Sequence, residues 1–150
     1  MTAALNRFIS RSADRYRPFF QLLNKWKGFK WTEECGLAFQ KLKECLSRLP
    51  IMSRPEVDEV LFAYITVASH AVSLVLIRDD SGVQKPVYYV SKSLHEAEVC
   101  YLPLERAILA VVHATRKLPH YFQSHTVVVL TQLPLKSLLR SADYTGRIAK

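Results

Sequence analysis

The sequence predicts an α/β fold, a mixed β-sheet with packed helices in the order β-β-β-α-β-α, after two or three N-terminal helices. Three observations lead to this class. Residues 60–67 and 71–78 alternate in the two-residue period of strands and flank a short turn. Residues 103–118 repeat apolar side chains at helical spacing. The short apolar run at 125–131 that follows is typical of a buried strand running parallel to the first.

The first segment, residues 2–27, has a helical pattern of apolar side chains. Ser12 is expected to cap a second helical piece, because serine side chains accept hydrogen bonds from the first amides of a helix. Pro18 interrupts that piece, because proline lacks the backbone donor that a helix interior uses. Residues 25–31, KWKGFKW, form a basic and aromatic connector.

A further helix is predicted to begin after Thr32 and to end before Pro50. Thr32 is the expected N-cap, and Glu33 and Glu34 lie in the first turn, where the helix dipole favours acids. One apolar stripe runs along this helix. It consists of Cys35, Ala38, Phe39, Leu42, Cys45, Leu46 and Leu49.

The strand region follows a linker that contains Pro55. Residues 79–82, DDSG, have the composition of a turn between the second and third strands. The third strand, VQKPVYYVS at 83–91, contains Pro86, which suits an edge strand because proline cannot donate to a neighbouring strand. The sheet is therefore expected to have its third strand at an edge.

The helix at 103–118 begins with Pro103, a residue favoured at the first helical position. Its expected apolar side consists of Leu104, Ile108, Val111, Val112, Thr115 and Leu118. After the strand at 125–131, residues 133–139 are predicted to start a short helix.

The length of 150 residues fits about one globular unit with a core of its own. We expect three parts: residues 1–50 with the N-terminal helices, a linker at 51–59, and a sheet domain at 60–150. No apolar run is long enough to span a membrane. The basic N-terminus lacks the features of a secretory signal, and a transit peptide is the alternative interpretation.

The formal net charge is +8, which suits a polyanionic partner such as a nucleic acid, although many basic domains bind no anion. The three cysteines, Cys35, Cys45 and Cys100, form no Cys-x-x-Cys pair, and the five histidines stand at no ligand spacing with them. This pattern argues against a disulfide framework and against a zinc ribbon.

Several motifs, in order, resemble the ribonuclease H region of gypsy-type long-terminal-repeat retrotransposon polyproteins. They are TVAS at 66–69, KPVYYVSKSL at 85–94, YLPLERAILAVVHATRKLPHYF at 101–122 and VVVLTQLPLKSLL at 127–139. WTEECGLAFQKLKECL resembles the helix that connects the polymerase thumb to this region, and ALNRFISRSADRYRPFFQLL resembles the end of the thumb. The resemblance implies a ribonuclease H-like fold, here expected to be truncated before its last strand.

Active members of the resembled family cleave the RNA strand of an RNA–DNA hybrid with two Mg²⁺ ions, which need a cluster of carboxylates. The resemblance places the first acid at Val67, the second at Glu105 and the third at Gln132. Only Glu105 is an acid in this chain. A fourth acid would lie farther on, beyond the last residue of the sequence.

We therefore predict no nuclease activity, no metal site and no cofactor. Glu105, near the start of a helix, is interpreted as a residue that stabilises the helix end. Val67 is interpreted as core and Gln132 as a loop residue. The alternatives are a weak metal-dependent hybrid ribonuclease that uses Glu105, and an open reading frame without a selected function.

The absence of acids at two of the expected positions resembles the Tat-like lineage of plant elements. In that lineage a degenerate ribonuclease H-like segment precedes an intact one. There the implied role is to join polymerase to nuclease and to support the hybrid duplex. The implied partners are an RNA–DNA hybrid and the rest of the polyprotein, with no membrane and no small-molecule ligand. The implied location of the parent element is a cytoplasmic particle or the nucleus.

Basic side chains are the candidates for phosphate contacts. They are Arg7, Arg11, Arg15, Arg17, Lys25, Lys27, Lys30, Lys92, Arg116, Lys117 and Lys136. Trp26, Phe29 and Trp31 are interleaved with the first set. The alternative is that the charges are ordinary solvated surface and that the two tryptophans belong to the core.

Overall fold

The computed structural model describes residues 6–24, 30–48 and 51–135. The N-terminal elements are η1 (Asn6–Phe8), α2 (Ser12–Arg15), α3 (Arg17–Asn24) and α4 (Glu33–Ser47). The sheet domain contains β1 (Leu61–Val67), β2 (Ala71–Asp80), β3 (Val83–Ser93), α5 (Glu96–Val99), α6 (Pro103–Lys117), α7 (Pro119–Ser124) and β4 (Val127–Leu130). The short helices α5 and α7 were not predicted, and most of the helix expected at 133–139 falls outside the described residues.

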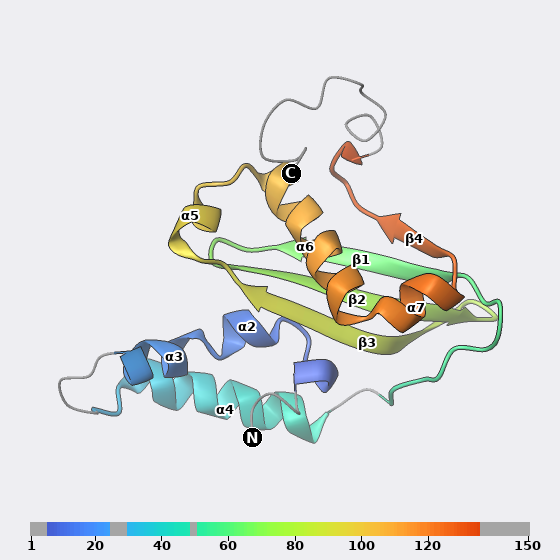
Figure 1. Ribbon diagram of the computed structural model, residues 1–150. Helices are drawn as coiled ribbons and strands as arrows, with labels where there is room; N and C mark the ends of the chain where they lie inside the picture. Colours follow the sequence, from blue (N-terminus) through green and yellow to red (C-terminus); the bar gives the residue numbers. More distant parts are fainter. Residues whose placement is uncertain (1–5, 25–29, 49–50, 136–150) are drawn as a thin grey trace.

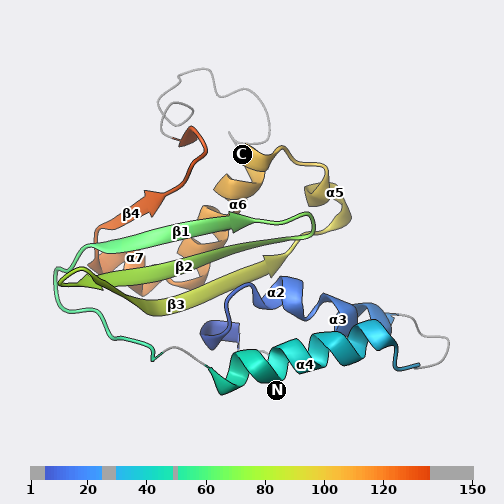
Figure 2. The same ribbon diagram turned by 180° about the vertical axis from the view of Figure 1, so that it is seen from behind.

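The four strands form one mixed sheet in the order β3-β2-β1-β4. β1 pairs antiparallel with β2 and parallel with β4, as the strand patterns predicted. Pro86 lies in the edge strand β3, where its missing N–H breaks no ladder between two strands. Figure 1 shows α6 crossing one face of the sheet, and the view from behind in Figure 2 shows the N-terminal helices beside β3.

The core lies between α6 and the inner face of the sheet. Its buried members are Leu61, Ala63, Leu74, Leu76, Val87, Val90, Ala114 and Leu118. The buried side of α6 overlaps the expected one only in part: Leu118 is buried and Val111 packs against the core, but Ala107, Ala110 and Ala114 are also buried and Val112 is 37% exposed. The prediction followed the large apolar side chains, whereas small alanine side chains let this helix pack close to the sheet.

The described part of the N-terminal segment forms three short pieces, η1, α2 and α3. Arg11, in a left-handed conformation with φ 54°, is the N-cap of α2, so the prediction that Ser12 caps this helix is wrong. Ser12 is the first helical residue and is only 1% exposed. It is buried because α2 packs against β2 and β3, where the Ala13 N–H donates to Ser91 Oγ at 3.0 Å.

Helix α4 begins as predicted, with Thr32 as its N-cap: Thr32 Oγ1 accepts a hydrogen bond from the Cys35 N–H. Trp31 lies just before it, with its ring centroid 6.1 Å from that of Phe19 and 6.1 Å from that of Phe39. Its side chain is still 51% exposed, so it is not part of a closed core. Trp26 lies outside the described residues.

The predicted linker, residues 51–59, is attached to the sheet. The Ser53 N–H donates to the carbonyl oxygen of Pro86 at 2.8 Å. Arg78 of β2 reaches the same segment: its guanidinium pairs with Glu59 at 3.0 Å and with Glu56 at 2.9 Å, and it donates to the Arg54 carbonyl oxygen. These contacts hold the entry into β1 against the rest of the sheet.

Candidate functional site at the ends of the parallel strands

Two of the three positions where carboxylates were expected lie together. Val67 is the last residue of β1, and Gln132 follows the end of β4. Because β1 and β4 run parallel, their carboxyl ends meet at one edge of the sheet. Val67, Thr131 and Gln132 line the same hollow there, which has a volume of about 600 Å³. The tertiary structure therefore brings the two substituted positions to one site.

Val67 belongs to the row of β1 side chains that faces the helix. Alternation along the strand places it on the same side as Leu61, Ala63 and Ile65, which belong to or pack against the core beneath α6. Val67 is half-buried. An aspartate at this position would direct a carboxylate toward the start of α6, and the valine directs two methyl groups there.

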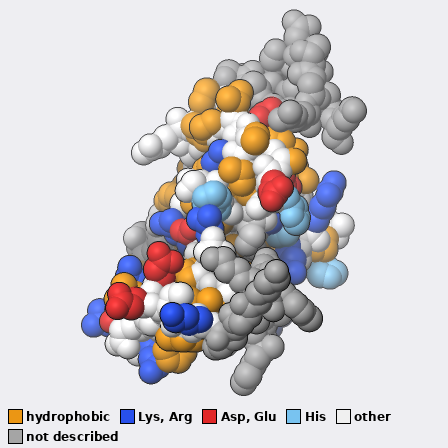
Figure 3. Space-filling model, turned by 90° about the vertical axis from the view of Figure 1, so that its left-hand side faces the viewer, with side chains coloured by type: hydrophobic (Ala, Val, Ile, Leu, Met, Phe, Trp, Pro, Cys, Tyr) orange, Lys and Arg blue, Asp and Glu red, His pale blue; other side chains and the backbone are white. Residues whose placement is uncertain are grey.

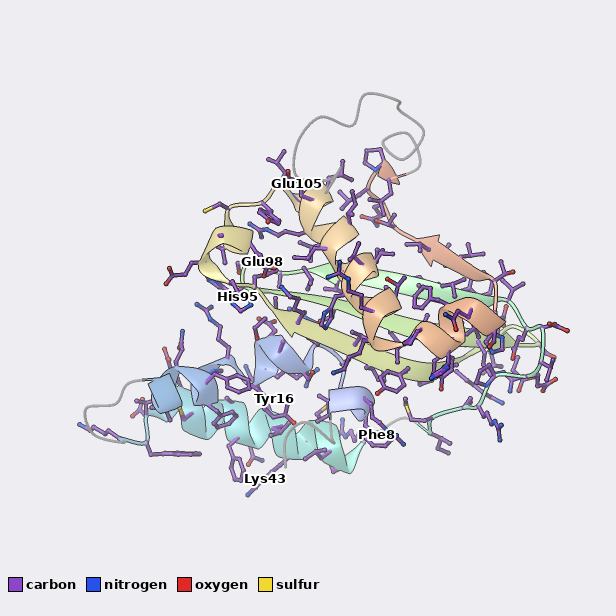
Figure 4. All side chains as sticks on the ribbon, viewed as in Figure 1. Phe8, Tyr16, Lys43, His95, Glu98 and Glu105 are labelled. Carbon is purple, nitrogen blue, oxygen red and sulfur yellow. The ribbon has the colours of Figure 1, made fainter. Side chains whose placement is uncertain are left out.

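Glu105 lies in the first turn of α6, where Figure 4 shows it at the end of the helix near α5. Its Oε2 accepts a hydrogen bond from the Leu102 N–H at 2.8 Å. The carboxylate thus binds the backbone at the start of its own helix, where it also favours the helix dipole. Glu105 does not line the hollow that contains Val67 and Gln132. This contact is the helix-end role expected from the sequence.

The side chains at this site do not fit a pair of Mg²⁺ ions. Val67 has no donor atom, Gln132 offers one neutral amide oxygen, and Glu105 is bound to the Leu102 N–H. Mg²⁺ prefers several oxygen ligands, with carboxylates among them. Across the described ranges, 6–24, 30–48 and 51–135, no group of three His, Cys, Asp or Glu side chains could hold a metal ion.

Arg106 is a residue of the site that the sequence did not indicate. Its Nη1 donates to the Ala68 carbonyl oxygen at 3.2 Å, its Nη2 to that of Val99 at 2.6 Å, and its Nε to that of Tyr101 at 3.0 Å. The guanidinium therefore joins the end of β1 to the loop before α6. No pattern in the sequence marked this residue, because its three acceptors are backbone oxygens that only the fold brings together.

The predicted phosphate-binding residues lie on two separate parts of the molecule. Arg7 and Arg11 are on the N-terminal helices, where Arg7 lies over the Phe8 ring and Arg11 pairs with Asp14 at 2.6 Å. Lys30 is exposed just before α4. Lys25, Lys27 and Lys136 lie outside the described residues. Arg15 ends α2 and Arg17 begins α3, so both also lie on the N-terminal helices. The remaining three, Lys92, Arg116 and Lys117, belong to β3 and to the last turn of α6.

Lys92, Arg116 and Lys117 share one electrostatic environment around His113. Burial lowers the pKa of His113 first, and the charges of Lys92, Lys117 and Arg116 lower it further, while Glu98 opposes them. Burial alone would raise the pKa of Glu98, but hydrogen bonds from Lys92 and from the His95 N–H outweigh it and lower the pKa. Of the three basic residues, Lys92 has its charge balanced by an ion pair with Glu98, whereas Arg116 and Lys117 are exposed in the last turn of α6.

Charges of both signs are mixed on the side of the molecule shown in Figure 3. Blue Lys and Arg side chains there alternate with red Asp and Glu side chains, and no continuous basic stripe crosses the side chains that are drawn. None of the helices in the described part is long and apolar enough to cross a membrane.

A family model matches residues 31–129, and its description is an RNase H-like domain found in reverse transcriptase. Two curated relatives, the transposon Tf2-3 and Tf2-4 polyproteins of Schizosaccharomyces pombe, are each 26% identical to this chain over 145 residues. These alignments cover 96% of this chain and 10% of each polyprotein. The chain thus spans about a tenth of the length of these relatives.

Two solved structures share the fold. The foamy viral protease-reverse transcriptase in complex with dsDNA superposes with a TM-score of 0.72, over 96% of this chain and 31% of that chain. Its complex with an RNA/DNA hybrid gives 0.74, over 94% and 19%. Sequence identity is 16% in both, so the likeness shows the fold alone. It confirms the predicted mixed sheet with packed helices as RNase H-like.

Proposed function

This chain belongs to the family of RNase H-like domains found in reverse transcriptase, and from that premise we propose that it is a noncatalytic member. In this proposal it joins the polymerase to a nuclease within a retrotransposon polyprotein and supports the RNA–DNA hybrid. The observation that carries the proposal is the meeting of Val67 and Gln132 at one end of the sheet. Cleavage of a phosphodiester by two metal ions needs carboxylates at that point.

The finer family assignment is also a proposal. We assign the chain to a gypsy-type element, in the degenerate Tat-like form known from plants, with an intact nuclease domain farther along the polyprotein. The substituted acids at Val67 and Gln132, with Glu105 retained, support this assignment. In the same proposal residues 1–50 are the thumb end and connecting helices, 51–59 the linker, and 60–150 the RNase H-like domain.

Nucleic acid is the proposed partner because charge and fold both favour it. The chain carries a net charge of +8, and neutralising phosphates with lysine and arginine is the main source of nonspecific affinity for nucleic acids. The foamy viral protein with the same fold was solved with an RNA/DNA hybrid. The exposed Arg116 and Lys117, in the last turn of α6, are the first residues to test.

The catalytic part of the proposal is tested with a labelled RNA–DNA hybrid in Mg²⁺ and in Mn²⁺. We expect the purified chain to release no more RNA fragments than the E105Q variant does. Cleavage of the RNA strand that disappears in E105Q would instead establish the alternative, a weak hybrid ribonuclease. E105Q is a suitable comparison because glutamine keeps an oxygen that can accept the Leu102 N–H.

The binding part is tested by fluorescence anisotropy of the same hybrid at two salt concentrations. We expect salt-sensitive binding that weakens by about threefold or more in R116Q/K117Q, because each phosphate contact contributes to the salt-dependent affinity. The matched control is K41Q/K43Q, which removes two positive charges from α4. Equal weakening by both variants would indicate a diffuse effect of net charge, and no binding at all would contradict the proposal.

A further inference from the structure

A cleft of about 760 Å³ lies between the N-terminal helices and the sheet domain, and it shares no lining residue with the hollow at Val67 and Gln132. One wall comes from α2 and α3, and the other from the turn after β1, the end of β3 and α5. Figures 1 and 2 both show α3 and α5 on the same side of the molecule. The cleft is therefore a second candidate site, built from parts of the chain that are distant in sequence.

The α3 wall of the cleft presents one aromatic ring and two polar side chains. Arg17, Phe20 and Gln21 line the cleft, and their positions along the helix place them on one side of it. Phe20 is 45% exposed, and no aromatic ring among the described residues stacks on it. Within the described ranges, the side chains of Arg17 and Gln21 make no hydrogen bond or ion pair. Both side chains are thus free to bind a ligand.

The opposite wall adds hydrogen-bonding groups and apolar surface. His70, Ser93 and Glu96 line it, together with Leu94 and Val99. The Leu94 N–H donates to the His70 carbonyl oxygen at 2.9 Å, which fixes the turn after β1 against the end of β3. The cleft therefore combines charged and polar groups with apolar side chains on both sides.

Both walls are anchored to β3. The Ala13 N–H donates to Ser91 Oγ at 3.0 Å, which ties α2 to this strand, and α3 begins two residues after α2 ends. Lys92 of β3 pairs with Glu98, which ties α5 to the same strand. A ligand would therefore enter a cleft that already exists, and little binding free energy would be lost in ordering the protein.

We propose that this cleft binds an unpaired nucleotide of single-stranded nucleic acid. Phe20 supplies a ring on which a base can stack, and Arg17 supplies a cation for its phosphate. Glu96 is the only acid among the described residues of the lining. Its carboxylate can accept hydrogen bonds from the N–H groups of a base, and it disfavours a ligand that is wholly anionic, such as free phosphate or an acidic peptide. The volume lies within the range of small-ligand sites, about 300–1,000 Å³.

A single strand is the expected ligand because a base must leave its stack to lie on Phe20. Bases inside a duplex are covered on both faces by their neighbours, whereas unpaired bases can be splayed out onto aromatic side chains. The inference rests on the proposed nucleic-acid partner and deepens it. In this arrangement the exposed Arg116 and Lys117 serve the hybrid duplex, and the cleft takes an unpaired stretch of strand.

The first test measures the binding of labelled single-stranded oligothymidylate and oligouridylate by fluorescence anisotropy. F20L keeps an apolar side chain but removes the ring, and R17Q removes the cation. The matched controls are F39L and R48Q: Phe39 is 42% exposed on α4, Arg48 follows that helix, and neither lines the cleft. We expect F20L and R17Q to weaken binding by about fivefold or more, and the controls by less than about twofold. Unchanged affinity in F20L, or equal weakening by F20L and F39L, would overturn the proposal.

A second test uses the unmodified chain, so that it does not depend on how a variant folds. Oligothymidylate that contains thiothymidine is cross-linked to the chain by near-ultraviolet light, and the modified peptides are identified by mass spectrometry. We expect cross-links in α3 and in residues 93–99, which belong to the two walls of the cleft. Cross-links confined to other parts of the chain would overturn the proposal.

The two proposals fail in different ways. If F20L weakened the binding of a blunt-ended RNA–DNA hybrid as much as that of oligothymidylate, the cleft would belong to a duplex-binding surface, and only the inference about single strands would be overturned. Binding of the hybrid without binding of either single strand would have the same consequence. RNA cleavage by the unmodified chain, or absence of hybrid binding, would refute the proposed function, and the single-strand measurements would still decide the inference.

Discussion

The two ends of the sheet are each held by one arginine, and the two arginines differ in what balances their charge. At the end where β1 begins, Arg78 pairs with Glu59 and Glu56 and also reaches a carbonyl oxygen of the linker. At the end where β1 stops, Arg106 binds three carbonyl oxygens and no described acid. At both ends an arginine joins separate parts of the backbone. Described carboxylates balance the charge of Arg78, and none balances the charge of Arg106.

The difference lies in whether a carboxylate accompanies the guanidinium. A half-buried arginine is usually accompanied by a carboxylate, because an unpaired charge is costly to remove from water. Arg78 follows that rule. Arg106 does not, because its acceptors are the carbonyl oxygens of Ala68, Val99 and Tyr101.

Removal of Arg106 should be the most damaging of these changes. R106Q leaves at least two of the three carbonyl oxygens without their donor and loosens the join between β1 and α6. We expect the free energy of unfolding to fall by about 2–3 kcal/mol, the range for losing hydrogen bonds to a charged group. Urea unfolding followed by circular dichroism measures it. If R106Q lowered the free energy of unfolding no more than R116Q does, the hydrogen bonds of Arg106 would add no stability.

Removal of Arg78 should lower stability by less than removal of Arg106. One of its partners, Glu56, has a side chain that is 78% exposed and recovers full hydration when the pair is lost. The other, Glu59, is only 16% exposed but keeps its hydrogen bond from the Glu56 N–H. The urea midpoint of R78Q is therefore expected between those of R106Q and the unmodified chain. A midpoint below that of R106Q would reverse the comparison.

Substitution of Glu105 should reveal its role at the helix end. E105A removes the acceptor for the Leu102 N–H and should cost about 0.5–1 kcal/mol, as for loss of a helix cap. E105Q, which can still accept that hydrogen bond, should cost less than half as much. Thermal unfolding of both variants tests this. Equal losses of stability in E105A and E105Q would mean that the charge of Glu105 matters and its hydrogen bond does not.

Acidification should weaken the Arg78 end and leave the Arg106 end unaffected. The hydrogen bond from the Glu56 N–H, helped by Arg78, holds the pKa of Glu59 below its ordinary value of 4.5. A carboxylate with a lowered pKa stabilises the fold above its unfolded pKa, and this stability is lost as the pH falls toward the folded value. Carbonyl oxygens do not titrate, so Arg106 adds no such dependence.

Urea midpoints measured from about pH 6 down to about pH 3.5 test this difference. E59Q should flatten the loss of stability below pH 4.5, because it removes one of the groups that titrate there. R106Q should lower the urea midpoint at every pH and leave the dependence of the midpoint on pH unchanged. A changed slope in R106Q would mean that Arg106 does act on a titrating group.

Much of the fold could be read from local patterns. The two-residue alternation fixed β1 and β2 to within two residues, and Pro86 indicated an edge strand. Thr32 and Pro103 marked the starts of α4 and α6. The failures came where packing overrode the pattern: Ser12 is buried beside the sheet instead of capping a helix, and alanines form the buried side of α6.

The sequence alone determined which residues stand at the positions expected to carry acids, because the identity of Val67 and Gln132 depends on nothing else. Only the tertiary structure decided that these two positions share one hollow, since parallel pairing brings together the ends of β1 and β4. It also decided what Arg106 does, because its guanidinium binds Ala68, 38 residues earlier in the chain. No local pattern encodes a contact over that distance, and it exists only once α6 lies on the sheet.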